Sequence, residues 1–119
     1  NHMNLGAGNR DYFTIREFRR MKRHPIFLNM ARGVSINEED LAQALDEGIL
    51  RGAGLDVLSD ETPKLEGHHL VNRRNLIITP HAAFFSKEAF EDMQRISCEN
   101  IVHFVKGEKE NVFRLVNEV

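Results

Sequence analysis

The chain has 119 residues, the length of one ordinary domain, and its hydrophobic content of 41% suffices for a modest core. Its 16 lysines and arginines nearly balance its 18 aspartates and glutamates, so its charge of −2 disfavours nucleic acid and anionic membrane as main partners. No apolar run approaches the roughly 20 residues that span a bilayer, and the single Cys98 is expected to be a reduced, half-buried thiol. These properties favour a cytoplasmic protein that binds a small, mostly neutral ligand or another protein.

The first half of the chain alternates helix and strand signals. Apolar residues recur at helical spacing after Thr14, whose side chain suits an N-cap, and Pro25 ends this predicted helix. Residues 26–28 form a short apolar run that is typical of a buried strand. A second helix is predicted after the capping residue Asn37, and Gly48 offers its C-terminal stop.

The second half continues this alternation. Residues 52–57 are apolar except for one acid and predict a second buried strand. Residues 75–79 predict a third short strand, which Pro80 stops. The charged segment 59–74 between them is predicted to be mainly loop. A long helix is predicted over residues 86–106, with an apolar side that we expect to be buried through Met93, Ile96, Ile101 and Phe104. Strands that alternate with helices predict an α/β fold with a parallel sheet.

Chemically unusual side chains follow each predicted strand. Arg32 follows the first, Asp56 and Glu61 follow the second, and His81 follows the third. Parallel strands end at the same edge of a sheet, where α/β proteins bind ligands, so we expect a guanidinium, a carboxylate and an imidazole in one cleft. Each residue taken singly also has a structural interpretation: a solvated surface arginine, an aspartate that caps a helix or a turn, and a structural Pro-His.

Four motifs occur in a recognisable order along the chain. Residues 28–33 (Leu-Asn-Met-Ala-Arg-Gly) contain N-x-x-R-G, residues 52–57 (Gly-Ala-Gly-Leu-Asp-Val) contain G-x-x-x-D-V, Glu61 follows, and residues 79–81 are Thr-Pro-His. This order resembles the C-terminal half of the NAD-binding domain of D-isomer-specific 2-hydroxyacid dehydrogenases, and the resemblance covers nearly the whole chain. One departure is Thr62, which stands where the family usually has a proline directly after its catalytic glutamate.

The resemblance implies an NAD-dependent oxidoreductase that transfers hydride between nicotinamide and a D-2-hydroxy acid or 2-keto acid. Arg32 would hold the substrate carboxylate through a forked pair, and His81 would be the general acid and base. Glu61 would fix the tautomer of that imidazole and favour its protonated form. The resemblance also implies that five residues contact NAD: Ala31, Arg32, Asp56, His81 and Ala83. No metal ion is expected at the site.

The family's glycine fingerprint, G-x-G-x-x-G, is absent from the chain, because residues 6–8 (Gly-Ala-Gly) lead into polar residues without a third glycine at the needed spacing. We therefore expect residues 1–119 to be the C-terminal part of a Rossmann domain, a partial Rossmann-like parallel sheet with flanking helices. Residues 1–3 are interpreted as a cloning remnant and residues 108–119 as a C-terminal tail. Such a fragment is expected to be inactive alone and, with a sheet edge unpaired, to form a homo-oligomer.

A non-enzymatic alternative stays open: a dinucleotide-sensing or protein-association module on the same scaffold. Residues 82–86 permit it, because they lack the glycines common in many members and resemble the lactate-dehydrogenase-like and corepressor-like branches of the family, whereas the presence of Arg32, Glu61 and His81 together favours the enzyme. A metal site at His68, His69 and Glu66 is disfavoured, because adjacent histidines on a loop rarely converge on one ion. A basic cluster is interpreted as the solvated face of a helix; it consists of Arg16, Arg19, Arg20, Lys22, Arg23 and His24.

Overall fold

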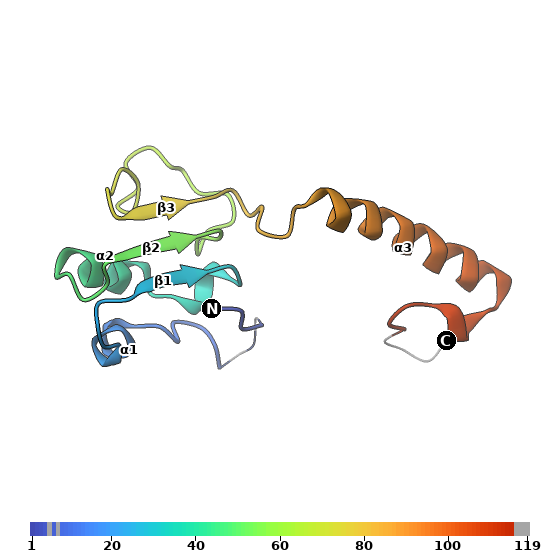
Figure 1. Cartoon of the computed structure of the whole chain (residues 1–119), viewed down its shortest axis with the longest axis horizontal. Helices are drawn as coiled ribbons and strands as arrows, with labels where there is room; N and C mark the ends of the chain where they lie inside the picture. Colours follow the sequence, from blue (N-terminus) through green and yellow to red (C-terminus); the bar gives the residue numbers. More distant parts are fainter. Residues whose placement is uncertain (5, 7, 116–119) are drawn as a thin grey trace. The chain divides into compact units, whose positions relative to one another are not determined.

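The computed structural model describes residues 1–4, 6 and 8–115, which form two compact units that divide between Ala83 and Phe84 (Figure 1). The first unit contains a small sheet with two helices, and the second contains one long helix. In the part of the chain that the structure describes, no helix is both long enough and apolar enough to cross a membrane.

Three parallel strands form the sheet of the first unit, in the order β1-β2-β3 (Figure 1). Their bounds are Ile26–Asn29 for β1, Gly52–Leu55 for β2 and Leu76–Ile78 for β3. The central strand pairs with both neighbours, and its Ala53 lies opposite Phe27 on one side and Leu76 on the other. The predicted fold class, a partial Rossmann-like α/β sheet with flanking helices, is confirmed.

Capping side chains begin both helices of the first unit. Thr14 precedes α1 (Ile15–Arg20), and Glu17 returns its carboxylate to the Thr14 N–H at 3.2 Å. Asn37 precedes α2 (Glu38–Asp46) and accepts the N–H of Asp40 at 3.0 Å. The first helix ends five residues before Pro25, because the backbone is already extended at its C-cap. Both helices contribute to the core, which comprises Phe18, Phe27, Ile36, Leu41, Ala42, Ala44, Leu45, Leu50, Ala53, Leu55, Leu58 and Leu70.

The sheet buries only one of its faces. Along β1, Phe27 and Asn29 are buried, whereas Ile26 is 54% and Leu28 is 50% exposed. Ile77 in β3 is 70% exposed. The interpretation of the first strand as buried is therefore wrong for one of its faces in the described structure, because a short apolar run does not tell whether one face or both are covered. An uncovered apolar face is consistent with the expected homo-oligomer, which stays a prediction.

The long helix α3 (Lys87–Lys106) forms as predicted, with a cap at each end. The Ser86 hydroxyl accepts the N–H of Ala89 at 3.0 Å, and Gly107 ends the helix with a left-handed φ of 76°. The predicted burial of its apolar side is wrong in the described structure: no residue of α3 is buried, including Met93, Ile96, Ile101 and Phe104, and Cys98 is exposed. Periodicity identifies the apolar side of a helix, but it does not supply the element that covers that side.

Candidate active site

The turn after β1 is organised by a buried asparagine. The Asn29 side chain is inaccessible to solvent; its Oδ1 accepts the N–H of Ala31 at 3.1 Å, and its amide donates to the Arg32 carbonyl at 3.0 Å. The Ser35 hydroxyl donates to the same carbonyl at 2.7 Å. The backbone of this turn is thereby fixed, and it presents the exposed Arg32 side chain, one of whose N–H groups donates to the Ala31 carbonyl at 2.8 Å.

Gly33 brings that turn against the segment that follows β2. A Cβ atom at this position would lie 1.9 Å from the Leu58 carbonyl oxygen and 2.4 Å from the Ser59 nitrogen. Both contacts are to backbone, so a side chain cannot be accommodated without moving the chain. The glycine after Arg32 therefore lets the arginine turn pack on the start of the loop that carries Glu61.

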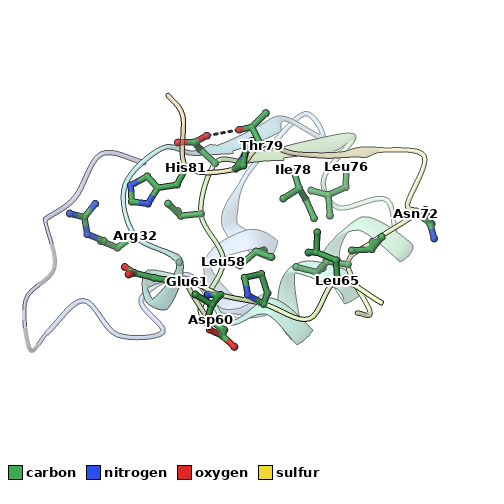
Figure 2. Close-up of a pocket in the computed structure, with 18 residues that line it drawn as sticks. Arg32, Leu58, Asp60, Glu61, Leu65, Asn72, Leu76, Ile78, Thr79 and His81 are labelled. Atoms are coloured by element: carbon green, nitrogen blue, oxygen red, sulfur yellow. Dashed lines mark hydrogen bonds between the residues drawn. The ribbon is translucent and has the colours of Figure 1, made fainter. Parts of the chain in front are cut away.

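Asp56, at the end of β2, holds the turn that follows β3. It is 2% exposed. Its Oδ1 accepts the Thr79 hydroxyl at 2.5 Å, drawn as a dashed line at Thr79 in Figure 2, and the N–H of Ala82 at 2.9 Å. Its Oδ2 accepts the N–H of Ala83 at 2.8 Å. Burial favours the neutral acid, but these hydrogen bonds outweigh it and keep the pKa of Asp56 below its ordinary value. This geometry favours the interpretation of Asp56 as a turn-forming acid; its contact with a cofactor stays a prediction.

His81 lies in the turn that Asp56 holds, with an unusual backbone conformation. Its φ is 53°, in the left-handed region that few residues other than glycine adopt. Its N–H donates to the carbonyls of Asp56 at 2.8 Å and Thr79 at 3.0 Å. Strained backbone persists where its surroundings hold it in place, and it is frequent at active sites. Among the described residues, a positive φ also occurs at Asp11, Arg23, His24, Asn72 and Arg114, so this conformation alone does not mark His81 as functional.

The predicted arginine, glutamate and histidine line one cavity of about 770 Å³. Figure 2 shows Arg32, Glu61 and His81 at one end of it and apolar side chains, including Leu65 and Ile78, toward the other. The expectation that these three side chains share a cleft is confirmed, and their chemical roles stay a prediction. Of the five residues expected to contact NAD, Arg32, Asp56 and His81 line this cavity, whereas Ala31 and Ala83 do not.

The other candidate sites have local partners. His68 lies 3.6 Å from the carboxylate of Glu38, and His69 lies 3.8 Å from that of Glu39. Within the described residues, no group of three histidines, cysteines or acids could hold a metal ion. Two members of the basic cluster pair with acids, Arg16 with Glu17 at 2.8 Å and Arg19 with Glu47 at 3.3 Å. These contacts suit structural side chains: the His68–Glu38 pair is largely shielded from water, and the Arg16 side chain is exposed.

Two polar residues that position the site have no role in the sequence interpretation. They are Asn29, which shapes the Arg32 turn, and Thr79, which donates to Asp56. Each is the polar residue at the end of a predicted strand, directly before a turn that carries a candidate catalytic group. That placement is the signal by which both could have been found.

Residues 1–83 match the family described as D-isomer specific 2-hydroxyacid dehydrogenase, NAD binding domain. Glycerate dehydrogenase of Methylorubrum extorquens is 38% identical over 113 residues, which cover 93% of this chain and 36% of that protein. D-lactate dehydrogenase of Lactiplantibacillus plantarum is 38% identical over 104 residues, which cover 77% of this chain and 31% of that protein. This chain spans about a third of the length of such curated relatives.

Solved structures agree with the sequence comparison. The structure of D-lactate dehydrogenase with NAD+ from Lactobacillus jensenii superposes with a TM-score of 0.85 at 26% identity, covering 98% of this chain and 38% of that one. D-lactate dehydrogenase from Aquifex aeolicus, complexed with NAD and lactic acid, gives a TM-score of 0.81 at 25% identity, covering 93% and 38%. The family match, the shared fold and the order of the motifs lead to one conclusion: this chain belongs to the D-isomer specific 2-hydroxyacid dehydrogenase family and carries part of its NAD binding domain.

Proposed function

We propose that the protein carrying this chain is an NAD-dependent oxidoreductase that transfers hydride between nicotinamide and a D-2-hydroxy acid or 2-keto acid. The observation that carries this proposal is the shared cavity of Arg32, Glu61 and His81, in a chain of this family. We expect residues 1–119 alone not to catalyse this reaction, because they span only about a third of the length of the related enzymes.

Each of the three side chains suits a step of that reaction. The planar guanidinium of Arg32 has five N–H donors, more than its contact with Ala31 uses, and can bind a substrate carboxylate through two parallel hydrogen bonds. His81 donates a proton to the carbonyl oxygen of a keto acid during reduction and removes it from the hydroxyl during oxidation. Glu61 orients the imidazole of His81 and stabilises its protonated form by opposite charge.

The residues of this chain fit one end of NAD. The cavity of about 770 Å³ is within the size range of small-ligand sites, roughly 300–1,000 Å³, and the proposed proton-transfer groups lie at one end of it (Figure 2). When bound, NAD supplies the hydride acceptor or donor. The backbone cradle for the pyrophosphate is not encoded in residues 1–119, so these residues offer contacts on the nicotinamide side only.

The second candidate is a protein-association module without catalysis. It is favoured by the apolar side chains that the sheet leaves exposed, Ile26, Leu28 and Ile77. It differs from the enzyme in one respect that can be measured: an association module has no need of Arg32, Glu61 and His81 together in one cavity.

The test is NADH oxidation by the full-length protein with a panel of 2-keto acids. His81→Ala is expected to lower kcat by about two to four orders of magnitude, the usual contribution of a positioned proton donor. His69→Ala is the matched control, because His69 does not line the cavity and should leave kcat unchanged. Arg32→Lys should raise KM for the keto acid and lower kcat, because a lysine cannot form the forked pair. Near-normal rates in both site variants would favour the association module.

A further inference from the structure

One carboxylate fastens the β2–β3 connection to helix α2. Glu38, the first residue of α2, accepts the N–H of Ser59 on its Oε1 at 2.6 Å. Its Oε2 lies 3.6 Å from the Nε2 atom of His68. The side chains of Glu38 and His68 are only 14% and 18% exposed, so this contact is largely shielded from water.

The ring of His68 is oriented for this contact. Its Nδ1 accepts the N–H of Leu70 at 3.3 Å, and a ring nitrogen that accepts a hydrogen bond carries no proton. In the neutral ring the proton therefore resides on Nε2, which faces Glu38. Glu38 thus accepts a hydrogen bond from the Ser59 N–H on one oxygen, and its other oxygen lies 3.6 Å from the Nε2 atom of His68, an electrostatic contact longer than a hydrogen bond.

The two contacts of Glu38 are the ends of a short segment, residues 59–68. Within that segment lie Glu61 and the side chains that form one wall of the cavity, namely Asp60, Thr62, Pro63 and Leu65. Inside it, Asp60 accepts the N–H of Thr62 at 2.9 Å and closes a turn around Glu61. At the other end of α2, Asp46 pairs with Arg73, so the rest of the connection is also held to this helix.

We propose that Glu38 is a positioning residue of the active site: by contacting both ends of segment 59–68, it sets the position of the Glu61 carboxylate in the cavity that His81 also lines. This inference rests on the proposed function, since it assigns Glu38 a task in that reaction. Glu38 itself does not line the cavity, so it is expected to act through the segment that it holds. Its negative charge at the first turn of α2 is also favoured by the helix dipole.

Two variants separate the contacts of Glu38. Glu38→Ala removes both acceptors, whereas Glu38→Gln keeps an oxygen for Ser59 and places an NH2 group opposite the Nε2–H of His68. In the full-length protein, Glu38→Ala is expected to lower kcat by about 10- to 100-fold, the effect of misplacing a reacting group by about 1 Å. KM for NADH should change little, and Glu38→Gln should fall between wild type and Glu38→Ala. Glu39→Gln is the matched control, because Glu39 lies on the same turn with its side chain 81% exposed.

A double-mutant cycle distinguishes positioning from general destabilisation. If Glu38 acts through Glu61, Glu38→Ala should have little further effect on kcat when introduced into Glu61→Gln. Effects that multiply, or a wild-type kcat in Glu38→Ala, would overturn the inference. Should Glu38→Ala fail to fold, as judged by circular dichroism, the same cycle with Glu38→Gln decides.

A measurement without catalysis separates this inference from the proposed function. In the 119-residue chain, hydrogen exchange at the amides of Ser59 and Thr62 should be faster in Glu38→Ala than in Glu39→Gln. Equal exchange rates in the two variants would refute the inference that Glu38 holds segment 59–68, even if the enzyme assay detects activity. A full-length protein that reduces no 2-keto acid, combined with faster exchange in Glu38→Ala, would instead refute the proposed function and leave Glu38 as the residue that holds the loop.

Discussion

The buried carboxylate of Asp56 offers the sharpest test of how the candidate site is held together. In Asp56→Asn, the remaining oxygen can still accept the hydroxyl of Thr79 and the N–H of Ala82. In the wild-type structure the Ala83 nitrogen lies 2.8 Å from Oδ2 of Asp56. If the new amide nitrogen replaced Oδ2, it would face the N–H of Ala83, and two hydrogen-bond donors would oppose each other. Asp56→Ala would remove all three acceptor contacts.

The magnitudes follow from these contacts. A hydrogen bond to a charged group contributes about 1.5–3 kcal/mol, so Asp56→Asn should lower the free energy of unfolding by about 2–3 kcal/mol. Asp56→Ala should lower it by about 3–5 kcal/mol rather than more, because Thr79, Ala82 and Ala83 are exposed and water can satisfy part of what is lost.

Urea unfolding of the chain at pH 7 measures both values, with fluorescence of the single tyrosine, Tyr12, as a probe of the first unit. Asp60→Asn is the matched control: Asp60 is exposed, and asparagine keeps the oxygen that accepts the N–H of Thr62, so a change within about 0.5 kcal/mol is expected. If Asp56→Asn proved as stable as this control, the hydrogen bonds of Asp56 would not stabilise the fold.

Acid provides a second check on the same residue. Because the pKa of Asp56 in the folded protein is below its ordinary value of 3.8, its stabilisation is present above that value and is lost as the pH falls through the lower folded pKa. The difference in stability between wild type and Asp56→Asn should therefore be constant near neutral pH and shrink below about pH 4. A difference that stayed constant down to pH 2 would contradict this assignment.

Three further predictions concern other parts of the chain. Gly33→Ala should lower the free energy of unfolding by at least about 1–3 kcal/mol in urea, because its Cβ would lie 1.9 Å from the Leu58 carbonyl; unchanged stability would show that the two segments are not in contact. Glu17, whose hydrogen bond from the Thr14 side chain and contacts with Arg16 lower its pKa to about 2, should stabilise α1 above pH 4.5 and lose this effect as the pH falls toward 2. Comparing urea unfolding of wild type and Glu17→Gln at pH 5 and pH 2 checks this; an equal difference at both would argue against it. Finally, the 119-residue chain should self-associate and bind NADH only weakly, whereas a monomer in light scattering with micromolar affinity by titration calorimetry would contradict both expectations.

The amino-acid sequence by itself determined the elements whose signals are local. Asn37 and Ser86 cap their helices through side-chain contacts three residues along the chain, and Gly107 ends α3 with a backbone that glycine adopts easily. The gathering of Arg32 and His81 at one cavity also followed from sequence, because strands that alternate with helices run parallel and end at one edge.

Tertiary structure decided what depends on residues far apart in the chain. No pattern in the sequence shows that a side chain at position 33 would clash with the backbone of Leu58, or that Asp56 accepts hydrogen bonds from a turn more than 20 residues away. Nor does any pattern show that Glu38 contacts both ends of the loop around Glu61. Nor does periodicity reveal which apolar surfaces lack a cover, as on α3. Local propensity is set by neighbours within a few residues, whereas burial and buried hydrogen bonds depend on which segments fold against one another, and only the folded chain brings those together.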